Sequence, residues 1–141
     1  MENLEQRVWG RVLGQPGEVP DDLGALILTS QELATIYSHL AKSAGEKTKP
    51  LLKAIYQEEL TILNALKGIS RLQNRQVHLR PLPPPKTPAV RQLETCYHRS
   101  LRARQEYMAR SAGPEFGEAF RILADRAGEQ CARIAEILGI L

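Results

Sequence analysis

The sequence predicts an all-α protein built as a bundle of four long helices, with a short amphipathic helix before them. Leucine, alanine, glutamate, arginine and lysine are abundant, whereas runs in which β-branched and polar residues alternate are missing. Apolar residues recur at spacings of three and four in four long segments, and glycine or proline bounds these segments. With 141 residues, 43% of them hydrophobic, the chain is about one domain's worth and can bury a single core.

A short apolar face precedes the first long helix. Within residues 3–13 this face consists of Leu4, Val8, Trp9 and Val12. The turn-forming run Gly14-Gln15-Pro16-Gly17 ends it. We therefore interpret residues 1–19 as an amphipathic appendage that packs against a single domain formed by residues 20–141.

Capping and breaking residues set the bounds of the four long helices. The predicted helices span residues 20–43, 48–72, 89–112 and 114–139. Either Asp21 or Asp22 can cap the first helix, and Thr48 or its neighbours open the second. Pro50 and Pro114 fall in first turns, where the missing N–H has no partner within the helix.

Residues 74–87 join the two predicted hairpins and cannot be helical, because they end in Pro81-Leu82-Pro83-Pro84-Pro85-Lys86-Thr87. Fully extended, the segment reaches roughly 46 Å, whereas a helix of about 25 residues is about 38 Å long. The segment can therefore return the chain along a whole helix, and the second and third helices are predicted to run parallel. We interpret it as a semi-rigid polyproline connector rather than as a ligand for an SH3-type domain.

The two predicted hairpins form an internal repeat. Aligning Tyr37 with Tyr107 gives an offset of 70 residues, and aligning Ile55 with Leu123 gives an offset of 68. A turn that is two residues shorter in the second hairpin accounts for the difference. Two similar helical hairpins joined by a long crossover can form a four-helix bundle.

Polar residues interrupt the apolar stripe that each helix turns toward the core. In chain order the predicted stripes are Leu23, Leu26, Ser30, Leu33, Tyr37, Leu40 and Ala44; Leu52, Ile55, Glu59, Ile62, Leu66 and Ile69; Leu93, Tyr97, Ser100, Ala103 or Arg104, and Tyr107; and Phe116, Phe120, Leu123, Ala127, Gln130, Ile134 and Ile137. The notable polar members are Ser30, Glu59, Ser100 and Gln130. Glu59 is the only carboxylate among them.

Three stretches of the sequence carry a resemblance to a known family. They are Leu26-Ile27 through Tyr37-Ser38-His39-Leu40-Ala41, Glu58-Glu59 followed by Leu66-Lys67-Gly68-Ile69, and Phe116-Gly117-Glu118-Ala119-Phe120 through Leu138-Gly139. Over residues 20–139 the chain resembles the ferritin-like di-iron proteins, in particular their rubrerythrin-like branch. The resemblance implies a ferritin-like four-helix bundle in which the first and third helices each supply a glutamate, and the second and fourth each supply Glu-x-x-His, to two metal ions.

Most of the ligand positions implied by this resemblance hold other residues. The positions fall at Ser30, Glu59, Ile62, Ser100, Ala127 and Gln130. Only Glu59 is of a residue type that the family uses as a metal ligand at its position. The other five side chains lack the negative charge and the imidazoles that two iron ions need. His39 and His98 point away from the inward stripes, and His78 lies beside the proline tract. We therefore expect no metal or other cofactor, and we interpret Glu59 as a core carboxylate that hydroxyl or amide groups hydrogen-bond.

The leading functional hypothesis is a non-catalytic, metal-free protein with a structural or protein-interaction role and an unknown partner. A homodimer formed through a helix face or through the segment around Trp9 fits this hypothesis. An alternative is a rubrerythrin-like di-metal oxidoreductase or an iron-binding protein. The sequence contains no phosphate-binding loop and no nucleophile elbow. Cys96 and Cys131 lie 35 residues apart without a CxxC motif and are interpreted as ordinary helix residues.

The charge of the chain gives little support to nucleic-acid binding. The net charge is +3, with 19 positive and 16 negative side chains interspersed. One basic stretch, which contains Arg99, Arg102, Arg104 and Arg110, leaves weak nucleic-acid binding as a second alternative. No apolar run reaches the roughly 20 residues of a membrane span, and no secretory leader opens the chain. Together with the two unpaired cysteines, these features predict a cytoplasmic protein with no membrane contact.

Overall fold

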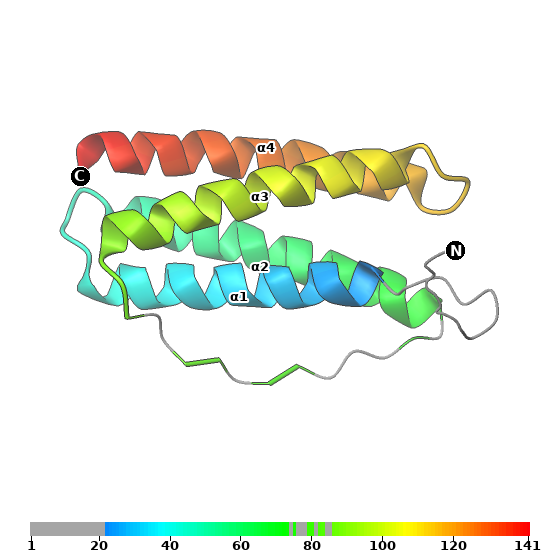
Figure 1. The fold of residues 1–141 in the computed structure, drawn as a ribbon, viewed down its shortest axis with the longest axis horizontal. Coiled ribbons are helices and arrows are strands. Elements are labelled where there is room, and N and C mark those ends of the chain that lie inside the picture. Colours follow the sequence, from blue (N-terminus) through cyan, green and yellow to red (C-terminus); the bar gives the residue numbers. More distant parts are fainter. Residues whose placement is uncertain (1–21, 74, 76–78, 81, 84–85) are drawn as a thin grey trace, which may run out of the picture.

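The computed structural model describes residues 22–141 except 74, 76–78, 81, 84 and 85. The described residues form four helices and no strands: α1 (Asp22–Ser43), α2 (Lys49–Leu72), α3 (Ala89–Ser111) and α4 (Gly117–Ile140) (Figure 1). The all-α prediction is confirmed. The predicted appendage, residues 1–19, lies outside the described residues. None of the described helices is both long enough and apolar enough to cross a membrane.

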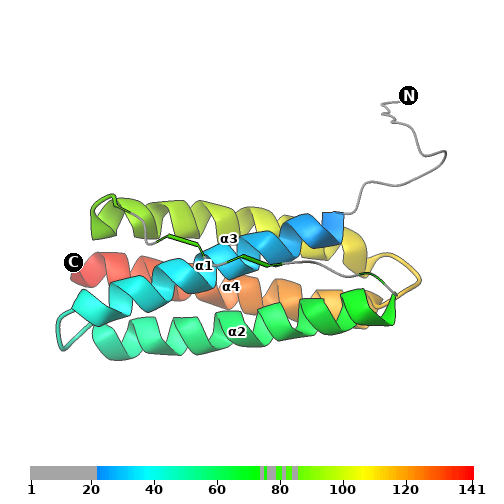
Figure 2. The same cartoon turned by 90° about the horizontal axis from the view of Figure 1, so that it is seen from below.

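The helices pack as two antiparallel hairpins that together make a four-helix bundle. The first hairpin consists of α1 and α2, and the second consists of α3 and α4. The hairpins meet through α1 against α3 and through α2 against α4. The crossover carries the chain from one end of the bundle to the other, so that α2 and α3 run in the same direction (Figures 1 and 2). The predicted parallel course of these two helices is thereby confirmed.

Described parts of the crossover contact the first hairpin. Gln31 Nε2 on α1 donates a hydrogen bond of 2.8 Å to the Arg80 carbonyl. Leu79 packs, partly buried, against the core. At the start of the crossover, Ser70 Oγ donates to the Arg75 carbonyl at 3.1 Å. These contacts hold the long connection against α1 and the end of α2.

The start of α4 differs from the prediction. The sequence places it at Pro114, but the helix begins at Gly117. Phe116, directly before it, has φ 61° and lies in the left-handed region, which costs a residue with a Cβ atom about 1–2 kcal/mol. A Cβ atom at Gly117 would lie 2.7 Å from the Ser111 carbonyl oxygen. Residues 112–116 thus form the turn between α3 and α4. Pro114 belongs to this turn rather than to the helix.

The core consists of two apolar clusters, and each draws on all four helices. The first contains Leu23, Leu26, Ile27, Ile62, Leu63, Leu66, Ile69, Ala103, Tyr107, Phe120, Leu123, Ala124 and Ala127. The second contains Leu33, Ile36, Tyr37, Leu40, Ala41, Leu52, Ile55, Leu93, Cys96, Ile134 and Ile137. The predicted stripes are buried except at their ends and on α3. There Cys96 is buried where the prediction has Tyr97, which is only half-buried, and Ala103 rather than Arg104 faces the core.

Candidate functional site

A layer of polar side chains separates the two apolar clusters. Each helix contributes one member: Ser30 from α1, Glu59 from α2, Ser100 from α3 and Gln130 from α4. Their exposed fractions are 1%, 3%, 2% and 0%. On every helix, the residues on one side of this position belong to the first cluster and those on the other side to the second. We call these four residues the polar layer, and their burial confirms the predicted inward orientation.

The carboxyl group of Glu59 is bound by the hydroxyl of Ser30. Ser30 Oγ donates a hydrogen bond of 2.5 Å to Glu59 Oε2, a length typical of a hydroxyl that donates to a carboxylate. Gln130 lies near enough to lower the pKa of Glu59, but its Nε2 has no acceptor within hydrogen-bond distance. Glu59 is thus the core carboxylate that the sequence predicts, with the Ser30 hydroxyl as its donor.

The remaining polar groups of the layer are only partly hydrogen-bonded. Tyr37, about two helical turns beyond Ser30, donates from its hydroxyl to Gln130 Oε1 at 3.3 Å. Ser100 lies close enough to lower the pKa of Tyr37, yet Ser100 Oγ has no hydrogen-bond partner among the described residues. The layer therefore contains two buried polar atoms without a protein partner, Ser100 Oγ and Gln130 Nε2.

Burial changes the protonation of Glu59. Desolvation is the main cause, and it raises the pKa of this carboxyl from 4.5 to about 7. The hydrogen bond from Ser30 and the nearby Gln130 amide oppose the rise, whereas the charge of Glu58 adds to it. At neutral pH the carboxyl is therefore divided between its protonated and ionised forms.

The thiols and phenols near the layer are held in their neutral forms. Burial raises the pKa of the Cys96 thiol to about 12. Burial also raises the pKa of Cys131, which donates a weak hydrogen bond from Sγ to a backbone carbonyl of α3. The pKa values of Tyr37 and Tyr107 lie above the ordinary value for the same reason. A thiol must lose its proton before it can attack a substrate or bind a metal ion, and these surroundings oppose that loss.

The six positions that correspond to metal ligands of the resembled family are all buried, but their side chains do not make a metal-binding set. Ile62 and Ala127 offer only aliphatic carbon and belong to the first apolar cluster. Among the described residues, no group of three or more histidine, cysteine, aspartate or glutamate side chains is placed to hold a metal ion. His39 is half-buried and His98 is exposed, while His78 lies outside the described residues.

Sequence reasoning missed two ion pairs that flank the polar layer. Glu32 of α1 pairs with Arg99 of α3, and Glu58 of α2 pairs with Arg133 of α4 at 2.8 Å. Each pair joins the two hairpins, and each has a member within two residues of the layer. Partly exposed pairs of this kind contribute about 0.2–1 kcal/mol each, so they orient the hairpins more than they stabilise them. In the sequence, the one indication of these ion pairs is that their residues lie close to the residues of the polar layer.

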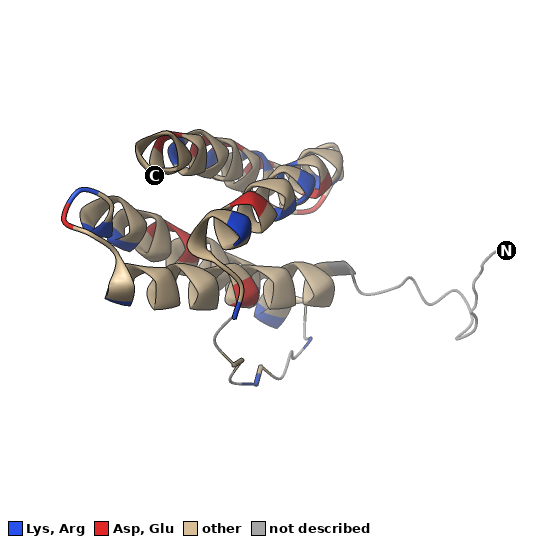
Figure 3. Ribbon diagram, turned by 60° about the vertical axis from the view of Figure 1, so that its left-hand side comes forward, with Lys and Arg blue, Asp and Glu red and all other residues tan. Residues whose placement is uncertain are grey.

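The arginine stretch of α3 does not form one basic face. Arg99 and Arg102 lie on the side that faces α1, whereas Arg104 approaches α4. Arg110 places its guanidinium 5.5 Å from the centroid of the Phe120 ring, also on α4. Basic and acidic residues are mixed along the helices (Figure 3). A nucleic-acid groove needs phosphate-binding cations side by side, and these four side chains diverge.

No protein-family model matches this sequence, and no curated protein and no solved structure matches it either.

Proposed function

We propose that this protein is a metal-free, ferritin-like four-helix bundle with a non-catalytic role, acting as a structural element or through protein–protein contacts. The donor set of the polar layer carries the proposal. One carboxyl, two hydroxyls, one amide and two aliphatic side chains stand at the six positions where the resembled family has anionic or imidazole ligands. Two parallel-running long helices joined by a crossover support the ferritin-like assignment.

The chemistry of the layer argues against a di-metal centre. Iron ions need several anionic oxygens and imidazoles to offset their charge. Glu59 is the single carboxyl of the layer, its pKa near 7 leaves it partly neutral, and Ile62 takes the place of the neighbouring histidine. Groups that hydrogen-bond to metal ligands tune a metal site but do not replace missing ligands.

The same surroundings argue against acid–base or nucleophilic catalysis. The buried thiol of Cys96 has a pKa of about 12, so it stays protonated, and therefore weakly nucleophilic, at neutral pH. Glu59, whose pKa suits proton transfer, is only 3% exposed. A catalytic group must lie within reach of its substrate, whereas Glu59 is buried between the two apolar clusters.

Exposed apolar side chains on the helix surfaces support a role in association. Met108 of α3 and Ile122 of α4 are 45% and 48% exposed. We assign the protein a homodimeric state formed through such a helix face, in a reducing compartment where Cys96 and Cys131 stay as free thiols. Sedimentation of a dilution series tests this assignment: a monomer at every concentration would contradict it.

Metal content provides the main test. Protein grown in medium supplemented with iron, manganese and zinc is expected to carry metal well below one equivalent per chain. The Glu59→Gln variant serves as the matched control, because it keeps the side-chain shape and removes the only carboxylate of the layer. For each of the two proteins, the thermal midpoint with Fe(II) is expected to equal the midpoint without it. Reproducible binding near two equivalents, or an Fe(II)-dependent rise in midpoint that the variant lacks, would overturn the proposal in favour of a di-metal protein.

A further inference from the structure

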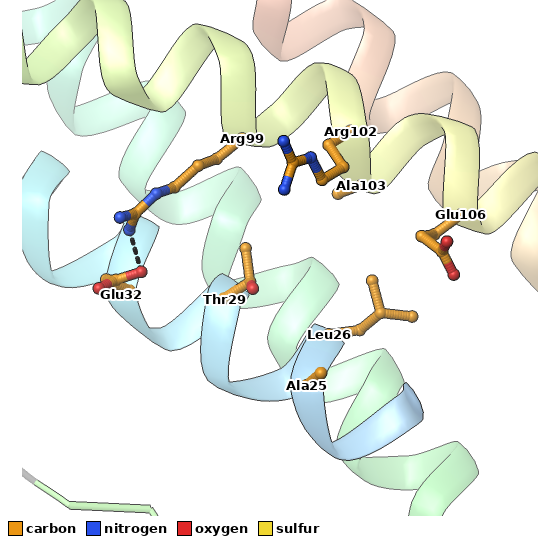
Figure 4. A pocket seen from close by; sticks show the side chains of 8 residues that line it. All are labelled: Ala25, Leu26, Thr29, Glu32, Arg99, Arg102, Ala103 and Glu106. Atoms are coloured by element: carbon orange, nitrogen blue, oxygen red, sulfur yellow. Dashed lines mark hydrogen bonds and ion pairs between the residues drawn. The ribbon is translucent and has the colours of Figure 1, made fainter. Parts of the chain in front are cut away.

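A groove of about 520 Å³ separates the two hairpins where α1 faces α3 (Figure 4). Four residues from each helix line it: Ala25, Leu26, Thr29 and Glu32 from α1, and Arg99, Arg102, Ala103 and Glu106 from α3. We call it the α1–α3 groove. Its size is that of a site for a small molecule or for a few side chains of a docked segment.

The floor of the α1–α3 groove is apolar. Leu26 and Ala103, 6% and 8% exposed, form the floor. The small side chain of Ala25 leaves space above it. Leu28, 48% exposed, shares this side of α1, because it lies three residues after Ala25 and four before Glu32. A partner that covers the groove therefore gains apolar burial beyond the groove itself.

Charged groups of both signs lie along the groove. Arg99 is ion-paired with Glu32 at one end (Figure 4). Arg102 and Glu106 both extend into the gap between the helices in Figure 4, and neither makes an ion pair or hydrogen bond with another described residue. The groove thus offers one cation and one anion to an occupant that carries both signs.

We propose that the apolar face within residues 3–13 of the same chain docks in the α1–α3 groove. The position of this segment in the chain supports the proposal. Residues 14–21 connect it to the start of α1 and span at most about 28 Å. The groove occupies residues 25–32 of α1, within about 15 Å of the start of that helix. The connection is therefore long enough for the segment to fold back onto the groove.

The composition of the segment matches the groove. Leu4, Val8 and Val12 repeat every four residues and supply an apolar face for the floor. The indole of Trp9 fills space above an alanine and can lie against the guanidinium of Arg102. Among the charged residues of the segment, Arg7 and Arg11 complement the two glutamates of the groove, and Glu5 complements its arginines.

A second groove is a poorer match for the segment. It has a volume of about 370 Å³ and follows residues 31–42 of α1, toward the far end of the bundle. Leu82 of the crossover already lines it. The α1–α3 groove is nearer to the segment along the chain and has no described residue of the crossover against it.

The fluorescence of Trp9 tests the proposal in the full chain, because this residue is the only tryptophan. We expect its emission to be shifted to shorter wavelength, and its quenching by iodide to be several-fold weaker, than in the free peptide of residues 1–13. Ala25→Lys places a long cationic side chain in the groove and should restore the emission and quenching of the peptide. Ala135→Lys, at an exposed alanine of α4 that lies outside the groove, is the matched control and should leave both unchanged.

Three results would overturn the proposal. If iodide quenches Trp9 in the full chain as strongly as in the peptide, the segment does not dock. A shielded Trp9 that Ala25→Lys leaves shielded would place it on another surface. Shielding that disappears on serial dilution would show that the segment binds a second copy. Circular dichroism confirms that each variant is folded, and Thr29→Lys, on the same wall of the groove, provides a second variant if Ala25→Lys loses helix content.

Discussion

The hydroxyl of Ser30 on α1 donates a 2.5 Å hydrogen bond to Glu59 Oε2 on α2, 29 residues further along the chain. Both side chains are almost completely buried between two apolar clusters. A carboxyl group in such surroundings loses its hydration, and the cost is large unless it takes up a proton or accepts a hydrogen bond. In this protein both responses occur, because the pKa is raised to about 7 while Ser30 supplies a donor.

The stability of the protein should fall as pH rises through the pKa of Glu59. The folded pKa is about 7 and the ordinary value is 4.5, so between these values the folded chain binds more protons than the unfolded chain. The stabilisation is therefore complete below about pH 4.5 and is lost as pH rises through 7, with a total of about 3 kcal/mol from this group. Urea unfolding at pH 5 and pH 7.5 measures the loss.

The Glu59→Gln variant provides the control for this pH dependence. Its amide does not titrate, so its free energy of unfolding should change less between pH 5 and pH 7.5 than that of wild type. At pH 7.5 the variant should be as stable as wild type or more stable, because the ionised form of Glu59 is absent. Equal pH slopes for the two proteins would show that Glu59 does not titrate in this range.

The two serines of the polar layer should respond differently to replacement by alanine. Ser30→Ala removes the donor from a buried carboxyl and should cost about 1–3 kcal/mol of unfolding free energy. Ser100→Ala removes a hydroxyl that has no described partner, and its effect should stay within about 0.5 kcal/mol or be stabilising. Chemical denaturation at pH 7 distinguishes the two, and a larger loss for Ser100→Ala would show that its hydroxyl is bonded after all.

Gly117 should not tolerate a methyl group. A Cβ atom there would lie 2.7 Å from the Ser111 carbonyl oxygen, next to the left-handed Phe116. Gly117→Ala should therefore cost about 1–3 kcal/mol, because the turn must open to relieve the overlap. Gly68, inside α2 with no atom within 4 Å of its ideal Cβ position, is the matched control, and Gly68→Ala should gain about 0.5–1 kcal/mol. Thermal denaturation of both variants checks the opposite signs.

Shortening the crossover to about five residues should prevent native folding. α2 and α3 run parallel, so the crossover has to return along the length of the bundle (Figure 1). Five extended residues reach only about 18 Å, roughly half the length of a helix of this size. Loss of the cooperative thermal transition is the expected result. A shortened variant with an unchanged transition would show that the helices can be connected without the long return.

The helices and the polar layer follow from spacing, and for this reason the sequence predicts them well. Ser30, Glu59, Ser100 and Gln130 each stand at a three-or-four spacing from apolar neighbours, and burial confirms all of them. The layer can be predicted without knowledge of tertiary contacts. A polar residue within an apolar stripe points into the core together with its apolar neighbours.

Other features depend on contacts that spacing does not encode. On α3, Cys96 and Tyr97 both fit the stripe between Leu93 and Ser100, and it is Cys96 that is buried in the second apolar cluster. The start of α4 depends on Phe116 in a left-handed conformation, which is rare for an aromatic residue and has no local signature. The metal-free function stays a prediction, and it depends on the ligand count rather than on any contact.

The polar layer also defines how the helices are aligned along their axes. If α2 moved by one turn, about 5.4 Å, the carboxyl of Glu59 would leave the Ser30 hydroxyl and face aliphatic side chains of one of the apolar clusters. The opposing apolar residues, by contrast, could exchange one leucine or isoleucine neighbour for another at small cost. A core made only of such residues would admit several alignments of similar energy. The buried contact between Ser30 and Glu59 forms in only one alignment, and that alignment is therefore preferred. In the same way, a lone buried polar residue selects the register of a coiled coil.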